Sequence, residues 1–282
     1  MSMPLPSIPL AQWIDAIIHF LTVHFAFITR AISAALGTGV NALVAALTWF
    51  PPWVLIIVLA ALAWWLAGKW AGVFTILGLM LLWNVNLWDA TVATLALVVV
   101  ATLIAVVIGL PLGVLAALFP GVKRVVVPIL DFMQTMPAFV YLIPAIPFFG
   151  LGTVSAIFST VIFAMPPAIR LTYLGIEQVP EDLIEAADAF GSSRQQKLWK
   201  IQLPIATPTI MAGINQTIML SLSMVVIAAM IGAGGLGQDV WKAIQRVEAG
   251  KGFVAGLGVV IVAIVLDRIT QSIGRRGQKA RA

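Results

Sequence analysis

The feature that most constrains this chain is its series of long apolar runs, several of which approach the roughly 20 residues that an α-helix needs to cross a bilayer. Hydrophobic residues make up 61% of the 282 residues, and charged residues only 10%. A soluble core cannot bury that much apolar surface, so the composition predicts an all-α, polytopic integral membrane protein surrounded by membrane lipids.

The apolar runs and the polar breaks between them predict about seven membrane-spanning helices. We place these helices at residues 52–67, 71–87, 92–119, 125–149, 153–171, 205–231 and 253–273. The chain then divides into an N-terminal tail with an amphipathic helix, two accessory spans, a core and a basic cytoplasmic tail. These parts cover residues 1–50, 51–91, 92–273 and 274–282.

The basic residues predict which side of the cell membrane each loop faces, because cytoplasmic loops carry an excess of lysine and arginine. With the C-terminus inside, twelve of the sixteen basic residues fall on the cytoplasmic side. The four on the outer side are Arg30, Lys242, Arg246 and Lys251. Seven crossings place the N-terminus outside. The net charge of +5 is spread between spans, which suits lipid headgroups and argues against nucleic acid as a partner.

The N-terminal tail carries polar residues at near-helical spacing from Asp15 to Ser33. This pattern favours an amphipathic helix that lies in the outer interface. The alternative is an eighth span, which would move the N-terminus inside. A signal peptide is not indicated, because no basic residue precedes the apolar run and Asp15 interrupts it.

Prolines gather in the third to fifth predicted spans, where each removes a backbone donor and bends its helix. Such backbone is tolerated at membrane depth when it packs against protein or lines a watery cavity. Residues 131–150 are therefore candidates to line a pathway, with ordinary kinks in a packed bundle as the alternative. Asp131 should face a cation such as Arg124 or Arg170. The candidate lining residues are Phe132, Met133, Met136, Pro137, Phe139 and Tyr141.

One segment, residues 177–204, is too charged to enter lipid. Pro180 and the acidic residues after it predict the start of a short helix, and Gly191 predicts its left-handed C-terminal cap. Ser193 and Gln196 form a capping-box pattern that opens a second helix, and Pro204 begins the return to the membrane. The charged residues are Glu177, Glu181, Asp182, Glu185, Asp188, Arg194, Lys197 and Lys200.

Apolar residues recur in helical register within this charged segment. Leu183, Ala187 and Phe190 share a face of the first predicted helix, and Leu198 and Ile201 share a face of the second. A helical elbow with an apolar ridge at the water surface predicts a docking surface. Its candidate contact residues are Leu183, Phe190 and Leu198.

The spacing within the elbow resembles the EAA loop of ABC importer permeases: Glu-Ala-Ala, three residues, Gly191, nine residues, Ile-Gln-Leu-Pro. The resemblance implies a type I ABC importer permease fold and a cytoplasmic ABC ATPase subunit that holds the elbow. The small alanines would allow close approach, and Gly191 would supply a turn that a side chain obstructs. The implied coupling residues are Glu185, Ala186, Ala187, Gly191, Ile201, Leu203 and Pro204.

Three further segments, 130–150, 165–176 and 230–237, are similar to permeases for glycine betaine, proline betaine and related quaternary amines. The resemblance implies a permease homodimer, two ATPase subunits and an extracellular substrate-binding protein that together import an osmoprotectant. Choline, carnitine or an amino acid is the alternative solute. The aromatic candidates in the pathway would suit a quaternary ammonium.

The sequence predicts a non-catalytic subunit without a cofactor. It lacks the GxxxxGK[ST] phosphate loop and metal-ligand spacing, and its two histidines, His19 and His24, both lie in the N-terminal tail. An ion-coupled secondary transporter or a channel is the alternative from another class, but neither explains a docking loop with this spacing. An intramembrane enzyme would need paired ionisable residues within its spans, and those are scarce.

Overall fold

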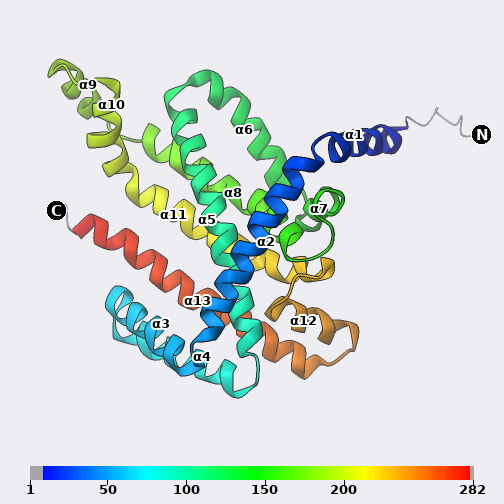
Figure 1. The fold of residues 1–282 in the computed structure, drawn as a ribbon. Helices are drawn as coiled ribbons and strands as arrows, with labels where there is room; N and C mark the ends of the chain where they lie inside the picture. The colour runs from blue at the N-terminus through cyan, green and yellow to red at the C-terminus, as the bar shows by residue number, and fades with distance from the viewer. Residues whose placement is uncertain (1–8, 280–282) are drawn as a thin grey trace, which may run out of the picture.

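The computed structural model describes residues 9–279, which form a helical bundle with no β-strand among them (Figure 1). The all-α prediction is confirmed for this part of the chain. The segments are α1 Leu10–His24, α2 Ala26–Trp49, α3 Pro52–Ala67, α4 Lys69–Asn84, α5 Trp88–Leu118, α6 Pro120–Thr135, η1 Ala138–Tyr141, α7 Leu142–Phe149, α8 Thr153–Glu177, α9 Glu181–Ala189, α10 Arg194–Lys197, η2 Leu198–Gln202, α11 Leu203–Ala228, η3 Ala229–Ile231, α12 Leu236–Gln245 and α13 Ala249–Lys279.

Helices α5, α8 and α11 pack against one another at the centre of the bundle. Glycines bring their backbones close, because lipid supplies no hydrophobic force between helices and small residues allow dense packing. A Cβ atom added at Gly113 of α5 would lie 2.7 Å from the carbonyl oxygen of Ile169 in α8. One added at Gly213 of α11 would lie 2.9 Å from the carbonyl oxygen of Pro167.

Five described helices are long and apolar enough to cross a membrane, or six if one bent pair counts as a single span. The bent pair consists of Pro120–Thr135 and Ala138–Phe149, and the chain bends by 113° between these two helices. The predicted span over 125–149 is therefore not one continuous helix. Met136 and Pro137 are extended, with ψ of 135° and 139°. Proline lacks an amide hydrogen and forces the preceding residue out of helical geometry, which breaks the helix here.

The two predicted accessory spans form α3 and α4, a pair of packed helices joined at Gly68. Each has 16 residues and is apolar. At 1.5 Å per residue each helix is about 24 Å long, which is shorter than the roughly 30 Å hydrocarbon layer. They are shorter than the helices that qualify as full spans.

The N-terminal segment differs from the single interfacial helix expected between Asp15 and Ser33. It forms α1 and α2, which are separated at Phe25. Helix α2 is 24 residues long and qualifies as a candidate span by length and composition. By length and composition it meets the requirement of the eighth-span alternative. The helix breaks at Phe25, whose φ of −103° and ψ of 12° lie outside the α-helical region.

The glycine-rich stretch after α11 forms a turn and then opens a helix that the sequence patterns did not reveal. Gly232 and Gly235 have φ of +87° and +92°. The amide of Leu236, the first residue of α12, donates to Oγ1 of Thr94 in α5 over 2.9 Å. The turn therefore ties α12 to the start of α5. Of the predicted basic tail, residues 280–282 lie outside the described residues, and α13 extends through Lys279.

Candidate functional site

The elbow, residues 177–204, lies at one end of the bundle, with α12 at the opposite end (Figure 1). Its first arm, α9, begins after Pro180 and carries Glu181 and Asp182 in its first turn, as predicted. Acidic side chains there interact favourably with the positive end of the helix dipole. The arm ends in two hydrogen bonds, from the amide of Gly191 to Asp188 O and from the amide of Ser192 to Ala187 O, both 2.9 Å. This pattern is a Schellman motif, so the predicted left-handed cap is confirmed.

Gly191 adopts φ of +72°, and a Cβ atom added there would meet no atom within 4 Å. The expected turn that disfavours a side chain is therefore present, although no neighbouring atom would clash with one. Space around the residue is open. The constraint is the backbone conformation itself, because a left-handed residue with a Cβ atom clashes with its own carbonyl.

The second arm begins with the predicted capping box. Ser193 N donates to Gln196 Oε1 over 2.8 Å, and Gln196 N donates to Ser193 Oγ over 3.3 Å. The arm does not end before the membrane. A π-helical turn, Leu198–Gln202, joins it to α11, so that one helix runs over Arg194–Ile231. Pro204 therefore does not begin the return to the membrane: it lies inside this helix, just after the π-helical turn, and the return starts at Arg194.

An ion pair that sequence patterns did not reveal joins the two arms. Nζ of Lys197 lies 2.6 Å from Oδ1 and 2.8 Å from Oδ2 of Asp188. The two residues are nine positions apart, outside the three- and four-residue spacing that identifies pairs within one helix. Only the reversal of the chain at Gly191 brings them together.

The three expected docking residues do not share one surface. Phe190 is 90% exposed and Leu183 is 44% exposed, so both are available to a partner. Leu198 is only 8% exposed and packs with Ile176 and Ala206, so its assignment to the docking face is wrong. The neighbouring Trp199, which was not predicted, is 65% exposed. Consecutive residues point in different directions around a helix, so Trp199 faces outward where Leu198 faces the bundle.

The remaining motif residues divide between the surface and the interior of the elbow. Glu185 and Ala186 are exposed, whereas Ala187 is buried against the elbow's own structure. Ile201, Leu203 and Pro204 are half-buried. The surface that a partner can reach is therefore made of Leu183, Glu185, Ala186, Phe190 and Trp199.

The candidate pathway residues also differ in their exposure. Phe132, Pro137 and Phe139 are exposed, while Met133 and Met136 are half-buried against core clusters. Tyr141 is buried. Its hydroxyl donates to Met133 O, and its ring meets Phe163 edge-on with centroids 5.7 Å apart. Tyr141 therefore holds η1 against the preceding helix, and its assignment to the pathway surface is wrong.

Two ion pairs connect α6 to α8. Asp131 pairs with Arg170, one of the two partners expected for it. Lys123 pairs with Glu177 over 2.7 Å, and its amino group also lies 5.4 Å from the ring centroid of Tyr173. The second pair links the start of α6 to the end of α8, next to the elbow.

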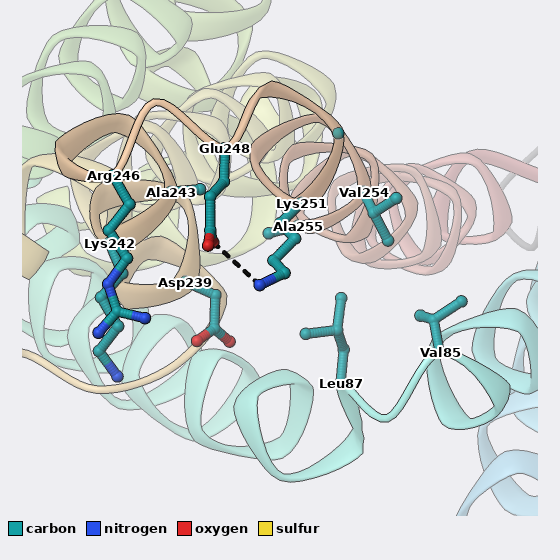
Figure 2. A pocket seen from close by; sticks show the side chains of 11 residues that line it. Val85, Leu87, Asp239, Lys242, Ala243, Arg246, Glu248, Lys251, Val254 and Ala255 are labelled. Atoms are coloured by element: carbon teal, nitrogen blue, oxygen red, sulfur yellow. Dashed lines mark ion pairs between the residues drawn. The ribbon is translucent and has the colours of Figure 1, made fainter.

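A pocket of about 480 Å³ lies at the end of the molecule opposite the elbow, between α12, the start of α13 and the α4–α5 turn. Figure 2 shows Lys242 of α12 and Arg246, which directly follows this helix, with Asp239 near them; Glu248 is paired to Lys251 over 3.1 Å. Val85, Leu87 and Val254 form an apolar wall. Within the described residues, neither Lys242 nor Arg246 makes an ion pair. With three basic and two acidic side chains in its lining, the pocket carries a small excess of positive charge beside an apolar surface.

An all-helical bundle of apolar spans with a rigid, capped elbow at one end defines the membrane-spanning subunit of a transport system. The family model described as "Binding-protein-dependent transport system inner membrane component" matches residues 109–279, a segment that includes the elbow. The chain belongs to this family, the inner-membrane component of ABC importers, which confirms the resemblance drawn from the elbow.

Curated relatives match the chain over nearly its full length. It is 52% identical to the glycine betaine transport system permease protein OpuAB of Bacillus subtilis (strain 168), over 95% of both chains. It is 51% identical to the glycine betaine/carnitine transport permease protein GbuB of Listeria monocytogenes serotype 1/2a, over 97% of this chain and 98% of that protein. It is 48% identical to the glycine betaine/proline betaine transport system permease protein ProW of Escherichia coli (strain K12), over 95% of this chain and 76% of that protein.

Among solved structures, an inward-facing form of the MetNI methionine ABC transporter resembles the chain with a TM-score of 0.59 and 28% identity. The match covers 70% of this chain and 96% of that one. The expected type I ABC importer permease fold is thereby confirmed.

Proposed function

We propose that this chain is the permease subunit of an ATP-driven importer for glycine betaine or a related quaternary-amine compatible solute. The observation that carries the proposal is the elbow: a capped, ion-paired turn with exposed apolar side chains, which has the spacing of a site that an ATPase subunit holds. The solute follows from relatives of nearly equal length whose names specify glycine betaine. This chain performs no chemistry, and ATP hydrolysis belongs to the partner.

The elbow is built to transmit motion. The Schellman cap, the capping box and the Asp188–Lys197 pair hold its two arms in one geometry. The second arm continues without interruption through Arg194–Ile231 to the far end of the bundle. A displacement of the elbow by the ATPase therefore moves a helix that extends across the molecule, as in rigid-body switching transitions. Of the coupling residues, Glu185 and Ala186 lie on the surface that the ATPase subunit would contact, and Gly191 lies in the turn between the arms.

The opposite end suits an extracellular substrate-binding protein. The pocket in Figure 2 offers the unpaired Lys242 and Arg246 beside an apolar wall, and charge complementarity steers association between proteins. The full assembly contains two copies of this chain, two ATPase subunits and one receptor.

The elbow and the C-terminus lie in the cytoplasm. A crossing by α2 would place the N-terminus there as well, opposite to the side expected from seven crossings.

Reconstitution tests the proposal. Vesicles that contain this chain, the ATPase subunit and the receptor should accumulate radiolabelled glycine betaine only when ATP is supplied on the side of the elbow. Omission of either partner should abolish uptake. Unlabelled carnitine, choline and proline, added as competitors, define the solute range. Uptake by this chain alone, driven by an ion gradient, would refute the importer assignment.

A further inference from the structure

The Asp131–Arg170 ion pair is exposed on the side of the bundle, where a membrane protein of one chain would meet lipid. The side chain of Asp131 is 59% exposed and that of Arg170 is 30% exposed. The Lys123–Glu177 pair joins the same two helices, α6 and α8, at their ends beside the elbow. The chain therefore holds a matched pair of interhelical ion pairs at two depths.

Helix geometry gives the position of the Asp131–Arg170 pair relative to the Lys123–Glu177 pair. Arg170 precedes Glu177, the last residue of α8, by seven residues, and Asp131 follows Lys123 by eight. At 1.5 Å per residue, these separations place the Asp131–Arg170 pair about 10 to 12 Å from the Lys123–Glu177 pair. The former pair therefore lies within the length of α8, a candidate membrane span, on the elbow side of that helix's centre.

Charged side chains at this depth do not face hydrocarbon, because their transfer into lipid is costly. Two polar side chains lie on the same face of α6 as Asp131. Gln134 and Thr135 are exposed and follow Asp131 by three and four residues, so all three share one face of α6. The side-chain amide of Gln134 makes no hydrogen bond to the described residues. This surface is therefore suited to water and a polar solute.

The pair has hydrogen-bonding capacity to spare. Arg170 donates to Oδ1 of Asp131, but a guanidinium has five N–H donors and a carboxylate has two oxygens. Phe132, adjacent to Asp131 in the chain, is 66% exposed and offers an aromatic face to a quaternary ammonium. A cation and an anion fixed side by side complement a zwitterion, whose carboxylate meets Arg170 and whose ammonium meets Asp131 and Phe132.

We propose that Asp131 and Arg170 form a low-affinity contact site for zwitterionic solutes in the half of the pathway nearest the elbow. This inference rests on the proposed function for the presence of a solute and extends it to named side chains. It also assigns unlike roles to the two interhelical pairs: Asp131–Arg170 contacts solute, whereas Lys123–Glu177 only connects helices.

Thiol labelling tests the site directly, because the natural chain contains no cysteine. Gln134→Cys reports on the same face without altering the pair. In nucleotide-free complex held in lipid nanodiscs, a membrane-impermeant sulfonate reagent should label this cysteine. Saturating glycine betaine should slow the labelling at least threefold relative to glycerol at equal osmolality. Leu103→Cys, on an exposed apolar surface of α5, should remain unlabelled.

Two double variants, each combined with Gln134→Cys, distinguish the roles of the two ion pairs. Asp131→Asn with Arg170→Gln should abolish protection of Gln134→Cys by glycine betaine, whereas Lys123→Gln with Glu177→Gln should preserve it. No labelling, labelling insensitive to solute, or equal protection in both double variants would each overturn the site. The measurement requires neither ATP nor uptake. A negative result would therefore leave the importer assignment intact, and failure of ATP-dependent uptake would be a separate finding.

Discussion

Nζ of Lys197 lies 2.6 Å from Oδ1 of Asp188, so an ion pair joins the two arms of the elbow across the turn at Gly191. The side chains are 18% and 55% exposed, respectively. A pair this open to water contributes little to global stability, about 0 to 1 kcal/mol. Its consequence is local: it holds α9 at a fixed angle to the helix that leads into the bundle.

Asp188→Asn should therefore leave the unfolding temperature of the detergent-solubilised complex almost unchanged while it lowers the solute transported per ATP hydrolysed. Loss of the pair loosens the joint between the arms without removing buried surface. The exchanged variant, Asp188→Lys with Lys197→Asp, should recover much of the coupling. Equal coupling in wild type and Asp188→Asn would show that the pair has no part in transmission.

Gly191→Val should uncouple ATP hydrolysis from uptake. A residue with a Cβ atom in the left-handed region costs about 1 to 2 kcal/mol, and a β-branched residue costs more, so the turn should open. Gly121→Val is the matched control, since that glycine also has open space around it but no left-handed φ. The check is the ratio of uptake to phosphate release in vesicles, which should fall for the first variant only.

Leu198→Ala and Phe190→Ala should have opposite effects, although both remove an apolar side chain from the elbow. Leu198 is buried with Ile176 and Ala206, so its truncation should destabilise the protein by about 2 to 5 kcal/mol. Phe190 is exposed, so its loss should spare stability and weaken binding of the ATPase subunit. Thermal unfolding and a pull-down of the ATPase measure the two effects. Destabilisation by Phe190→Ala would contradict its place on the surface.

Tyr141→Phe should reduce stability by about 1 kcal/mol, because it removes a buried hydroxyl that donates to Met133 O. The apparent KM for solute uptake should not change, since the ring is packed against Phe163 and lies away from the surface. Phe139→Ala should show the reverse pattern, with uptake altered and stability retained. A higher KM in Tyr141→Phe, with stability unchanged, would return Tyr141 to the pathway.

Interactions between residues that are close in the sequence determined much of this protein's secondary structure. Long apolar runs require helices in a membrane, and the caps at Gly191 and Ser193 are decided by residues that lie within one turn of each other. The spacing of the Glu-Ala-Ala segment also lies wholly within one stretch of sequence. For these features, sequence patterns predicted both the structure and the family.

Tertiary structure alone decided which faces are buried and which distant residues meet. The Asp188–Lys197 pair exists only because the chain reverses, and Leu198 is buried by neighbours from α8 and α11. Likewise, Tyr141 and Phe139 have similar chemistry two residues apart, yet one is buried and the other exposed. Burial is a property of packing between helices, and no local pattern specifies what will cover a given side chain.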